Sequence, residues 1–316
     1  MPPVVPVSCG LSCVHVGCSL RQQERAVLSI LLRGRQHGMS FAVSTAAMEG
    51  RLASLWKSAR WTMKIVVVGG RGLVGREVVN RLRAQGHAVV SASRASGVDL
   101  MTGQGLPEVL ADTEVVVDVS NSPTLDDVAA FTFFKTAAVN LLEAEVAAGI
   151  RHHIALSVVG TGRLGDSHYF CGKALQEQMI RASGIAFTIV HATQFFEFLV
   201  GIIEASVREQ TVRLSPAYIQ PVASADVAAT IAGLVVGPPV NGTIEIAGPE
   251  RERLSEIIRR FITDIEGPCD VVADARAPYF GAVLEDDSLL PLQSARIGTV
   301  GFKDWFDRSE FYRADW

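Results

Sequence analysis

A tyrosine and a lysine stand four residues apart in the stretch HYFCGK, at Tyr169 and Lys173. Residues i and i+4 share one face of a helix, so the two side chains are expected to point the same way. A phenol ionises near pH ~10, and a neighbouring ammonium favours the phenolate and tunes Tyr169 as a proton donor or acceptor. Ser157 ends the preceding apolar run, ALSVVG, where its hydroxyl can steady a substrate oxygen. These residues predict proton transfer only if the rest of the chain places them beside a bound dinucleotide.

This pattern also has plainer explanations. Tyr169 could pack at the edge of a cofactor, next to a Lys173 that only holds a ribose. Gly172 lies between the two and weakens the helix locally, because glycine costs about 1 kcal/mol against alanine in a helix interior. His152 and His153 begin a strand and are expected to point to opposite faces, so they are a poor metal pair. No metal site is expected.

The stretch KIVVVGGRGLVG places a glycine triplet, Gly69, Gly72 and Gly75, between a β-branched run and a helical pattern. Such glycines permit a tight turn, a close approach of a pyrophosphate and close packing of the helix on the strand. The helix N-terminus then offers free N–H groups to the phosphates. The residues predicted to bind the phosphates are Gly69, Gly70, Arg71, Gly72, Leu73, Val74 and Gly75.

The end of the second strand indicates which dinucleotide binds. NAD-binding proteins commonly carry an acidic residue there, but this strand ends in Ser93 and Arg94, and Arg71 is a second cation nearby. Two guanidinium groups suit a 2′-phosphate, so NADP(H) is preferred over NAD(H), unless Arg94 is a solvated surface charge. Asp99 and Leu100 are placed to line the adenine pocket, through the carboxylate or the backbone, although an ordinary strand-end aspartate fits equally well.

Strands and helices alternate from Met63 onward with short connections. This order predicts an α/β fold, a doubly wound parallel sheet of Rossmann type. Beyond Phe195 the regularity weakens, and residues 195–316 are expected to supply most of a small C-terminal substrate lobe. The helix in SADVAATIAGLVVG is expected to use Ser224 as its N-cap. Aromatic residues expected to line an apolar substrate site, or to be plain core, are Phe195, Phe196, Phe198, Tyr218, Tyr279 and Phe280.

Residues 1–62 differ in composition from the rest of the chain. They carry seven Lys or Arg and two acidic residues, whereas residues 63–316 carry 22 basic and 31 acidic residues. The segment is interpreted as an artefact of an upstream start site, because MKIVVVGG at Met63 resembles a natural beginning, or as a disordered arm. A third interpretation is an organelle-targeting peptide, because the segment is Arg-rich and poor in acids. Residues 63–316 are the expected NAD(P)-binding domain with its lobe.

The bulk composition limits the partners. The net charge of −4 gives a nucleic-acid role no electrostatic support. No apolar run reaches the ~18–20 residues that a membrane helix needs, so no span is expected. Cys171 and Cys269 are too sparse for a disulfide framework, which favours a reducing, cytoplasmic location. The expected partner is a small molecule, a carbonyl or quinone, and a homodimer is plausible.

Together, the glycine loop, Ser157 and the helix of Tyr169 and Lys173 resemble the short-chain dehydrogenase/reductase superfamily. The resemblance is to its atypical branch, the NmrA-like and NAD(P)H-binding quinone-reductase proteins, and it covers roughly residues 63–260. It implies Tyr169 as acid/base, Lys173 as its partner and Ser157 as the group that orients the substrate. It also implies that HATQFF, with Ala192 and Thr193, lies near the nicotinamide.

One loop departs from the pattern of that superfamily. Main-line members carry an asparagine-alanine-glycine signature after the third strand, where this chain has Ser120 and Asn121. These two residues are still expected to line the cofactor site. NmrA-like members can bind NADP without turnover, and several of them lack the Tyr or the Lys. Here both residues are present.

Four functions remain open on the sequence. The first is an oxidoreductase that transfers hydride from NADPH to a carbonyl or quinone. The second is a non-catalytic NADP(H)-binding redox sensor, and the third is a sugar-nucleotide epimerase or dehydratase. A role in assembling a respiratory complex would make residues 1–62 an import signal.

Overall fold

The computed structural model describes residues 62–124 and 128–309. Trp61–Trp316 form one compact unit, to which these residues belong. The predicted N-terminal extension, residues 1–62, lies outside the described part except for Thr62.

A seven-stranded sheet forms the centre of this unit, in the order β12-β9-β5-β4-β3-β1-β2. Every pairing within it is parallel. Because the chain runs from β1 outward to β2 and then returns to β3 on the other side, the strand order reverses at β1, where such folds bind ligands. The strands are β1 (Lys64–Val68), β2 (Ala88–Ala92), β3 (Val115–Asp118), β4 (His152–Val158), β5 (Phe187–Ala192), β9 (Gly242–Ala247) and β12 (Arg296–Ile297). The predicted doubly wound α/β fold is confirmed.

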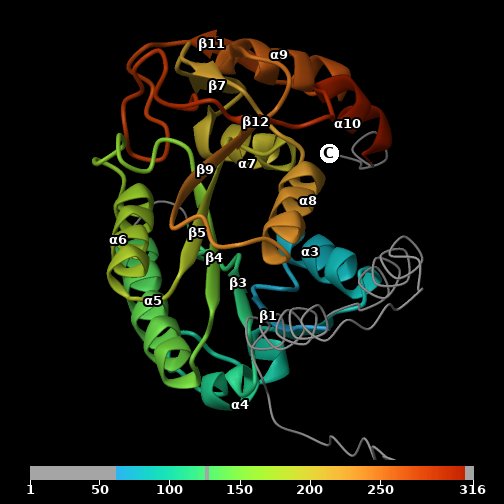
Figure 1. Cartoon of the computed structure of the whole chain (residues 1–316). Helices are drawn as coiled ribbons and strands as arrows, with labels where there is room; N and C mark the ends of the chain where they lie inside the picture. Colours follow the sequence, from blue (N-terminus) through green and yellow to red (C-terminus); the bar gives the residue numbers. More distant parts are fainter. Residues whose placement is uncertain (1–61, 125–127, 310–316) are drawn as a thin grey trace, which may run out of the picture. The chain divides into compact units, whose positions relative to one another are not determined.

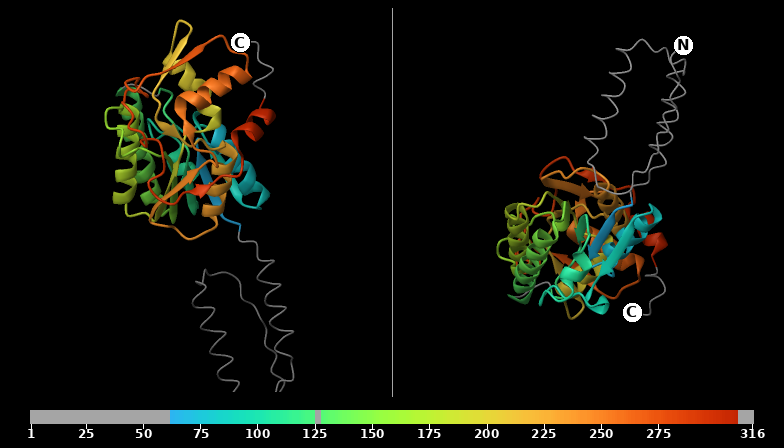
Figure 2. Two further views of the ribbon diagram at one scale, coloured as in Figure 1. Left: turned by 90° about the horizontal axis from the view of Figure 1, so that it is seen from above. Right: turned by 60° about the horizontal axis from the view of Figure 1, so that its bottom comes forward.

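Helices cover both faces of the sheet (Figure 1). One face carries α3 (Leu73–Ala84) and α8 (Ser224–Val235); the other carries α4 (Leu106–Leu110), α5 (Val128–Ala148) and α6 (His168–Ala182). Seen from above, the α5 and α6 pair and α3 lie on opposite sides of the sheet (Figure 2). Alternate residues of β1 and β3 enter the two cores, which is why these two central strands are continuous apolar runs.

Apart from the two cores on the faces of the sheet, a separate hydrophobic core lies beyond the carboxyl ends of the strands; it is called the second core below. It holds the stacked rings of Phe196 and Trp305, with Phe261 against them. Within residues 195–316, α8, β9 and β12 belong to the layers of the large sheet. The remaining elements are η2 (Phe196–Phe198), α7 (Leu199–Ser206), β6 (Val207–Arg208), β7 (Thr211–Leu214), β8 (Tyr218–Ile219), β10 (Glu252–Arg253), α9 (Leu254–Asp264), β11 (Asp270–Ala273) and α10 (Phe302–Arg308).

None of the helices in the described ranges is both long and apolar enough to cross a membrane.

The start of α8 differs from the prediction. The N-cap is Ala223, and Ser224 is the first helical residue. The carboxylate of Glu197, 27 residues earlier, accepts hydrogen bonds from the backbone N–H of Ser224 at 3.3 Å and from its hydroxyl at 2.6 Å. A distant side chain therefore caps this helix, and the prediction that Ser224 caps it was wrong.

Gly172 allows α6 to lie close against α5. A Cβ atom there would come within 2.9 Å of the Phe134 ring and 3.1 Å of the Phe131 Cα. Phe134 is fully buried and cannot easily move. The glycine that weakens α6 locally thus permits the packing that holds Tyr169 and Lys173 in place.

We therefore expect Gly172→Ala to lower the free energy of unfolding, although alanine is the better helix former. Overpacking typically costs about 1–3 kcal/mol, which exceeds the roughly 1 kcal/mol gained in helix propensity. Gly233→Ala in α8 is the matched control, since a Cβ there meets open space. Urea unfolding should show the control stabilised and Gly172→Ala destabilised. Stabilisation of both variants would contradict the packing argument.

Candidate functional site

A continuous cleft of about 1090 Å³ runs along the carboxyl ends of the central strands. It extends from the glycine loop after β1 to the second core. All but one of the sequence-predicted site residues line it, the exception being Gly70. The lining residues among them are Gly69, Arg71, Gly72, Leu73, Val74, Gly75, Ser93, Arg94, Asp99, Leu100, Ser120, Asn121, Ser157, Tyr169, Lys173, Ala192 and Thr193.

The glycine loop forms a cradle that side chains would fill. Gly69 has a φ of +76°, and a Cβ there would lie 2.8 Å from the Val119 carbonyl oxygen. A Cβ on Gly75 would lie 2.2 Å from the Gly69 carbonyl oxygen, so α3 can pack this closely only with glycine. Gly72 is the N-cap of α3 and has no side chain to cover the N–H groups of the first turn. These N–H groups and the positive helix end suit a pyrophosphate. Gly70 instead packs on Ser91 of β2.

Two cations flank this cradle. Arg71 and Arg94 are both exposed and line the cleft. Within the described residues, neither forms an ion pair. Asp99 turns its carboxylate back to accept the N–H of Met101 at 2.8 Å. The end of the second strand is therefore lined by guanidinium groups, with its carboxylate engaged in its own loop.

Lys173 is buried and donates into the protein. Its Nζ donates to the Leu156 carbonyl at 2.8 Å and to Gln176 Oε1 at 2.6 Å, and it lies 4.8 Å from the Phe134 ring centre. Gln176 in turn donates to Asp118 at the end of β3, at 2.8 Å. Burial lowers the pKa of Lys173 to about 8, against the opposing charges of Asp118 and Glu177.

Tyr169 is held at the cleft wall by rings and by one hydrogen bond. Its hydroxyl donates to Asn121 Oδ1 at 3.0 Å, and its ring meets the edges of Phe134 and Phe170 at 5.3 and 5.5 Å. Burial raises the pKa of the phenol, and the bond to Asn121 only partly opposes this. The expected lowering of the Tyr169 pKa by Lys173 is therefore not found, because that ammonium is directed toward Leu156 and Gln176.

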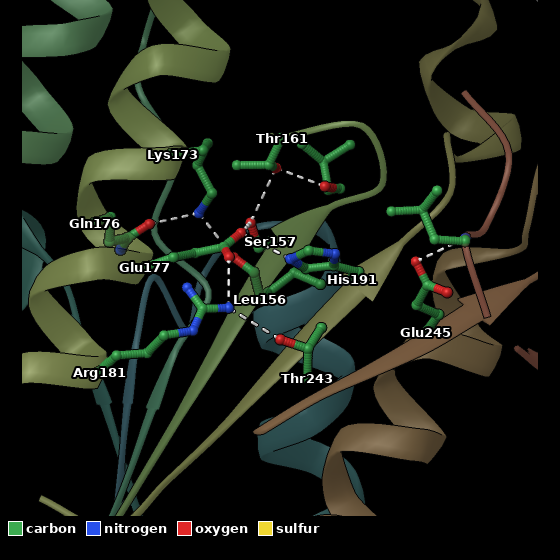
Figure 3. Close-up of polar contacts among 12 residues, drawn as sticks. Leu156, Ser157, Thr161, Lys173, Gln176, Glu177, Arg181, His191, Thr243 and Glu245 are labelled. Carbon is green, nitrogen blue, oxygen red and sulfur yellow. Dashed lines mark hydrogen bonds and ion pairs between the residues drawn. The ribbon is translucent and has the colours of Figure 1, made fainter. Parts of the chain in front are cut away.

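Ser157 belongs to a polar cluster between α6 and the sheet (Figure 3). Its hydroxyl donates to Glu177 Oε1 at 2.6 Å, and His191 Nε2 lies 2.8 Å from the same oxygen. Arg181 donates to Glu177 Oε2 at 3.0 Å and to Thr243 at 3.0 Å. His191 therefore has a hydrogen-bond partner, as expected for a polar side chain that is largely buried.

The far end of the cleft is aromatic. Of the six predicted aromatic residues, Phe195, Phe198, Tyr279 and Phe280 line it. Phe196 is core, stacked on Trp305, and Tyr218 lies against the guanidinium groups of Arg251 and Arg253. The lining cations of the described residues are Arg71, Arg94 and Lys173. This end suits a flat, apolar ligand.

Residues 69–238 match a family model described as NAD(P)H-binding, which is more than half of the chain. The chain belongs to this NAD(P)H-binding family. The predicted resemblance to the short-chain dehydrogenase/reductase superfamily is thereby confirmed at the level of an NAD(P)H-binding protein.

Two curated relatives of this NAD(P)H-binding protein differ in what they do. Over 44% of the chain it is 24% identical to the photosystem II assembly factor Ycf39 of Synechocystis, and it spans about half of that protein, 47%. Over 62% of the chain it is 28% identical to a (4-alkanoyl-5-oxo-2,5-dihydrofuran-3-yl)methyl phosphate reductase of Streptomyces griseus, covering 73% of it.

Solved structures share the fold of the NAD(P)H-binding protein. A dTDP-glucose 4,6-dehydratase of Streptomyces venezuelae, with NAD bound, superposes with a TM-score of 0.62 at 17% identity, covering 79% of this chain and 97% of that one. A dTDP-4-dehydrorhamnose reductase of Bacillus anthracis in complex with NADP gives 0.54 at 13% identity, covering 67% and 85%. At these identities the likeness concerns the fold alone.

The sequence interpretation missed the polar residues behind the site. Gln176 and Glu177 follow Lys173 by three and four residues, on the face of α6 that carries Tyr169 and Lys173. Both are buried. The signal that could have identified them is their spacing, because Gln176 and Glu177 fall on the same helix face as the Tyr and Lys pair of this NAD(P)H-binding protein.

Proposed function

We propose that this protein is an NADP(H)-dependent oxidoreductase that reduces a carbonyl or quinone. One observation carries the proposal: a single cleft joins the glycine cradle and its two free guanidinium groups to Tyr169 and Lys173. When bound, the nicotinamide supplies a hydride. Tyr169 gives the proton to the substrate oxygen, and Lys173 holds the ribose or the phenol. The second core, with its aromatic cleft wall, serves as the substrate lobe.

Reduction requires Tyr169 in its protonated form, and the phenol is protonated at neutral pH. Because burial raises the pKa of Tyr169, the negative charge that develops on the substrate oxygen has to draw the proton off. The proton now directed at Asn121 has to turn toward the substrate. Because Asn121 is exposed, that hydrogen bond is readily exchanged for water.

The test is NADPH oxidation by the purified protein against a panel of quinones, aldehydes and ketones. Turnover with at least one class is expected. Tight NADPH binding without turnover on the whole panel would favour the second candidate, an NADP(H) sensor. That candidate is supported by the hydrogen bonds of Tyr169, Lys173 and Ser157, each of which donates to a protein acceptor.

The preference for NADP(H) has its own test. Arg94→Gln should weaken NADPH binding roughly tenfold to a hundredfold, because a hydrogen-bonded charge on a phosphate is lost, and should leave NADH binding nearly unchanged. Arg76→Gln is the matched control, an exposed arginine on α3 that does not line the cleft. Calorimetric titration with both cofactors gives the result. An equal loss for NADPH and NADH would count against a 2′-phosphate contact.

A further inference from the structure

Ser157 directs its only proton away from the cleft. The hydroxyl donates to Glu177 Oε1 at 2.6 Å. Its other polar neighbour, Thr161 at 3.4 Å, donates its own proton to the Val158 carbonyl at 2.5 Å. A serine oxygen has one proton and two lone pairs. Among the described residues, no donor is therefore left to fill the lone pairs of Ser157.

Glu177 is fixed as an acceptor. Ser157, His191 and Arg181 all donate to this carboxylate, which is 6% exposed. Burial alone would raise the pKa of Glu177, but the hydrogen bonds and charge of these partners, His191 foremost, lower it to about 2. An ionised carboxylate only accepts hydrogen bonds. Ser157 thus keeps the same orientation throughout the neutral range.

The sheet and α6 hold this arrangement rigidly. Ser157 of β4 is paired in register with His191 of β5, and Glu177 reaches both from α6 (Figure 3). His191 is also in register with Glu245 of β9, whose carboxylate accepts the N–H groups of Leu292 and Gln293. Glu245 is thereby engaged elsewhere and leaves Glu177 as the acceptor for Ser157.

We propose that Glu177 positions Ser157 as a hydrogen-bond acceptor, so that the site selects a substrate with an N–H or O–H donor beside its reacting carbonyl. This rests on the proposed function, since it concerns the substrate of the same cleft. A bare carbonyl would set its lone pairs against those of Ser157. A neighbouring amine or hydroxyl pairs with them, while the carbonyl itself remains free for Tyr169.

The chemical class that meets this requirement is an amino- or hydroxy-substituted carbonyl or quinone. A flat quinone fits the aromatic wall formed by Phe195, Phe198 and Phe280. Sites built to pair with a polar group discriminate against analogues that lack it, because the buried group is then left unpaired.

Two neutral probes test the inference without turnover. 2-Amino-1,4-naphthoquinone carries a donor beside a carbonyl, and 2-methoxy-1,4-naphthoquinone has a group of similar size without one. Their dissociation constants are measured on the full chain saturated with NADP+. The amino compound is expected to bind roughly tenfold tighter, the ratio of one hydrogen bond of about average strength.

Three variants show whether Glu177 sets this preference. In Glu177→Gln, the amide oxygen can take the Oε2 position and accept from Arg181. The amide NH2 in the Oε1 position then donates to Ser157 and to His191 Nε2, which accepts in its other neutral tautomer, and Ser157 turns its own proton to the cleft. The preference should disappear or reverse. Ser157→Ala should abolish it. Arg181→Gln is the matched control, since it removes an exposed partner of the same carboxylate and should keep the preference.

Equal affinities for the two probes in the wild type would overturn the inference. So would a preference that survives Glu177→Gln, or failure of both probes to bind. Because binding is measured apart from NADPH oxidation, the two proposals fail separately. Turnover without the preference removes only this inference, whereas the preference without turnover on the panel removes only the reductase.

Discussion

Replacing Tyr169 by phenylalanine is expected to reduce kcat by about a hundredfold or more, the usual contribution of a positioned acid or base. The variant removes one oxygen atom and keeps the ring that packs on Phe134 and Phe170. The dissociation constant for the cofactor should therefore change by no more than a factor of about two, which is well under 1 kcal/mol of binding free energy. The measurement is steady-state NADPH oxidation with the best substrate of the panel, together with a binding titration.

Tyr218→Phe is the matched control, because Tyr218 lies against Arg251 and Arg253, outside the cleft. Full activity of Tyr169→Phe would show that another group supplies the proton. The next candidate would be Tyr279, which also lines the cleft and whose pKa is likewise raised by burial.

The largest loss of stability is expected for Glu145→Leu. Glu145 of α5 and His153 of β4 are almost completely buried, with His153 Nδ1 2.9 Å from both carboxylate oxygens. Burial alone would lower the pKa of His153, but the charge and hydrogen bond of Glu145 outweigh it and raise that pKa. Removing one partner of a buried pair typically costs about 3–5 kcal/mol, because the other is left uncompensated. Urea unfolding measures this loss.

The double variant Glu145→Leu/His153→Leu should recover part of the loss, since replacing both members of a buried pair by apolar residues is often nearly neutral. Glu114→Ala, which breaks an exposed ion pair with Arg151, should change the unfolding free energy little. A double variant as unstable as the single one would mean that volume, and not the buried pair, determines the effect.

Local sequence patterns predicted those features of the molecule that depend only on residues close together in the sequence. The strand, glycine triplet and helix around Gly69 follow from backbone geometry, which the residues themselves encode. The opposite faces of His152 and His153 follow from strand alternation: His152 contacts Thr188 at 3.0 Å, and His153 contacts Glu145. Spacing likewise placed Tyr169 and Lys173 together on the cleft wall.

Spacing could not predict where the protons of those side chains point. The acceptors of Lys173 lie on β4 and one turn further along α6, and the acceptor of Tyr169 lies 48 residues earlier. Ser157 meets Glu177 across the space between strand and helix. The cap of α8 comes from Glu197 for the same reason. Such contacts depend on how elements pack, and the sequence of one element does not contain them.

The cleft is built from two kinds of wall, and this bears on how the protein can evolve. The cofactor side includes the glycine loop, where a side chain at Gly69 or Gly75 would clash with backbone. The opposite side includes Tyr279 and Phe280, which stand in a loop of the second core. Loops tolerate exchange better than the elements that they connect. Descendants of this chain can therefore acquire new substrates while inheriting the same cofactor.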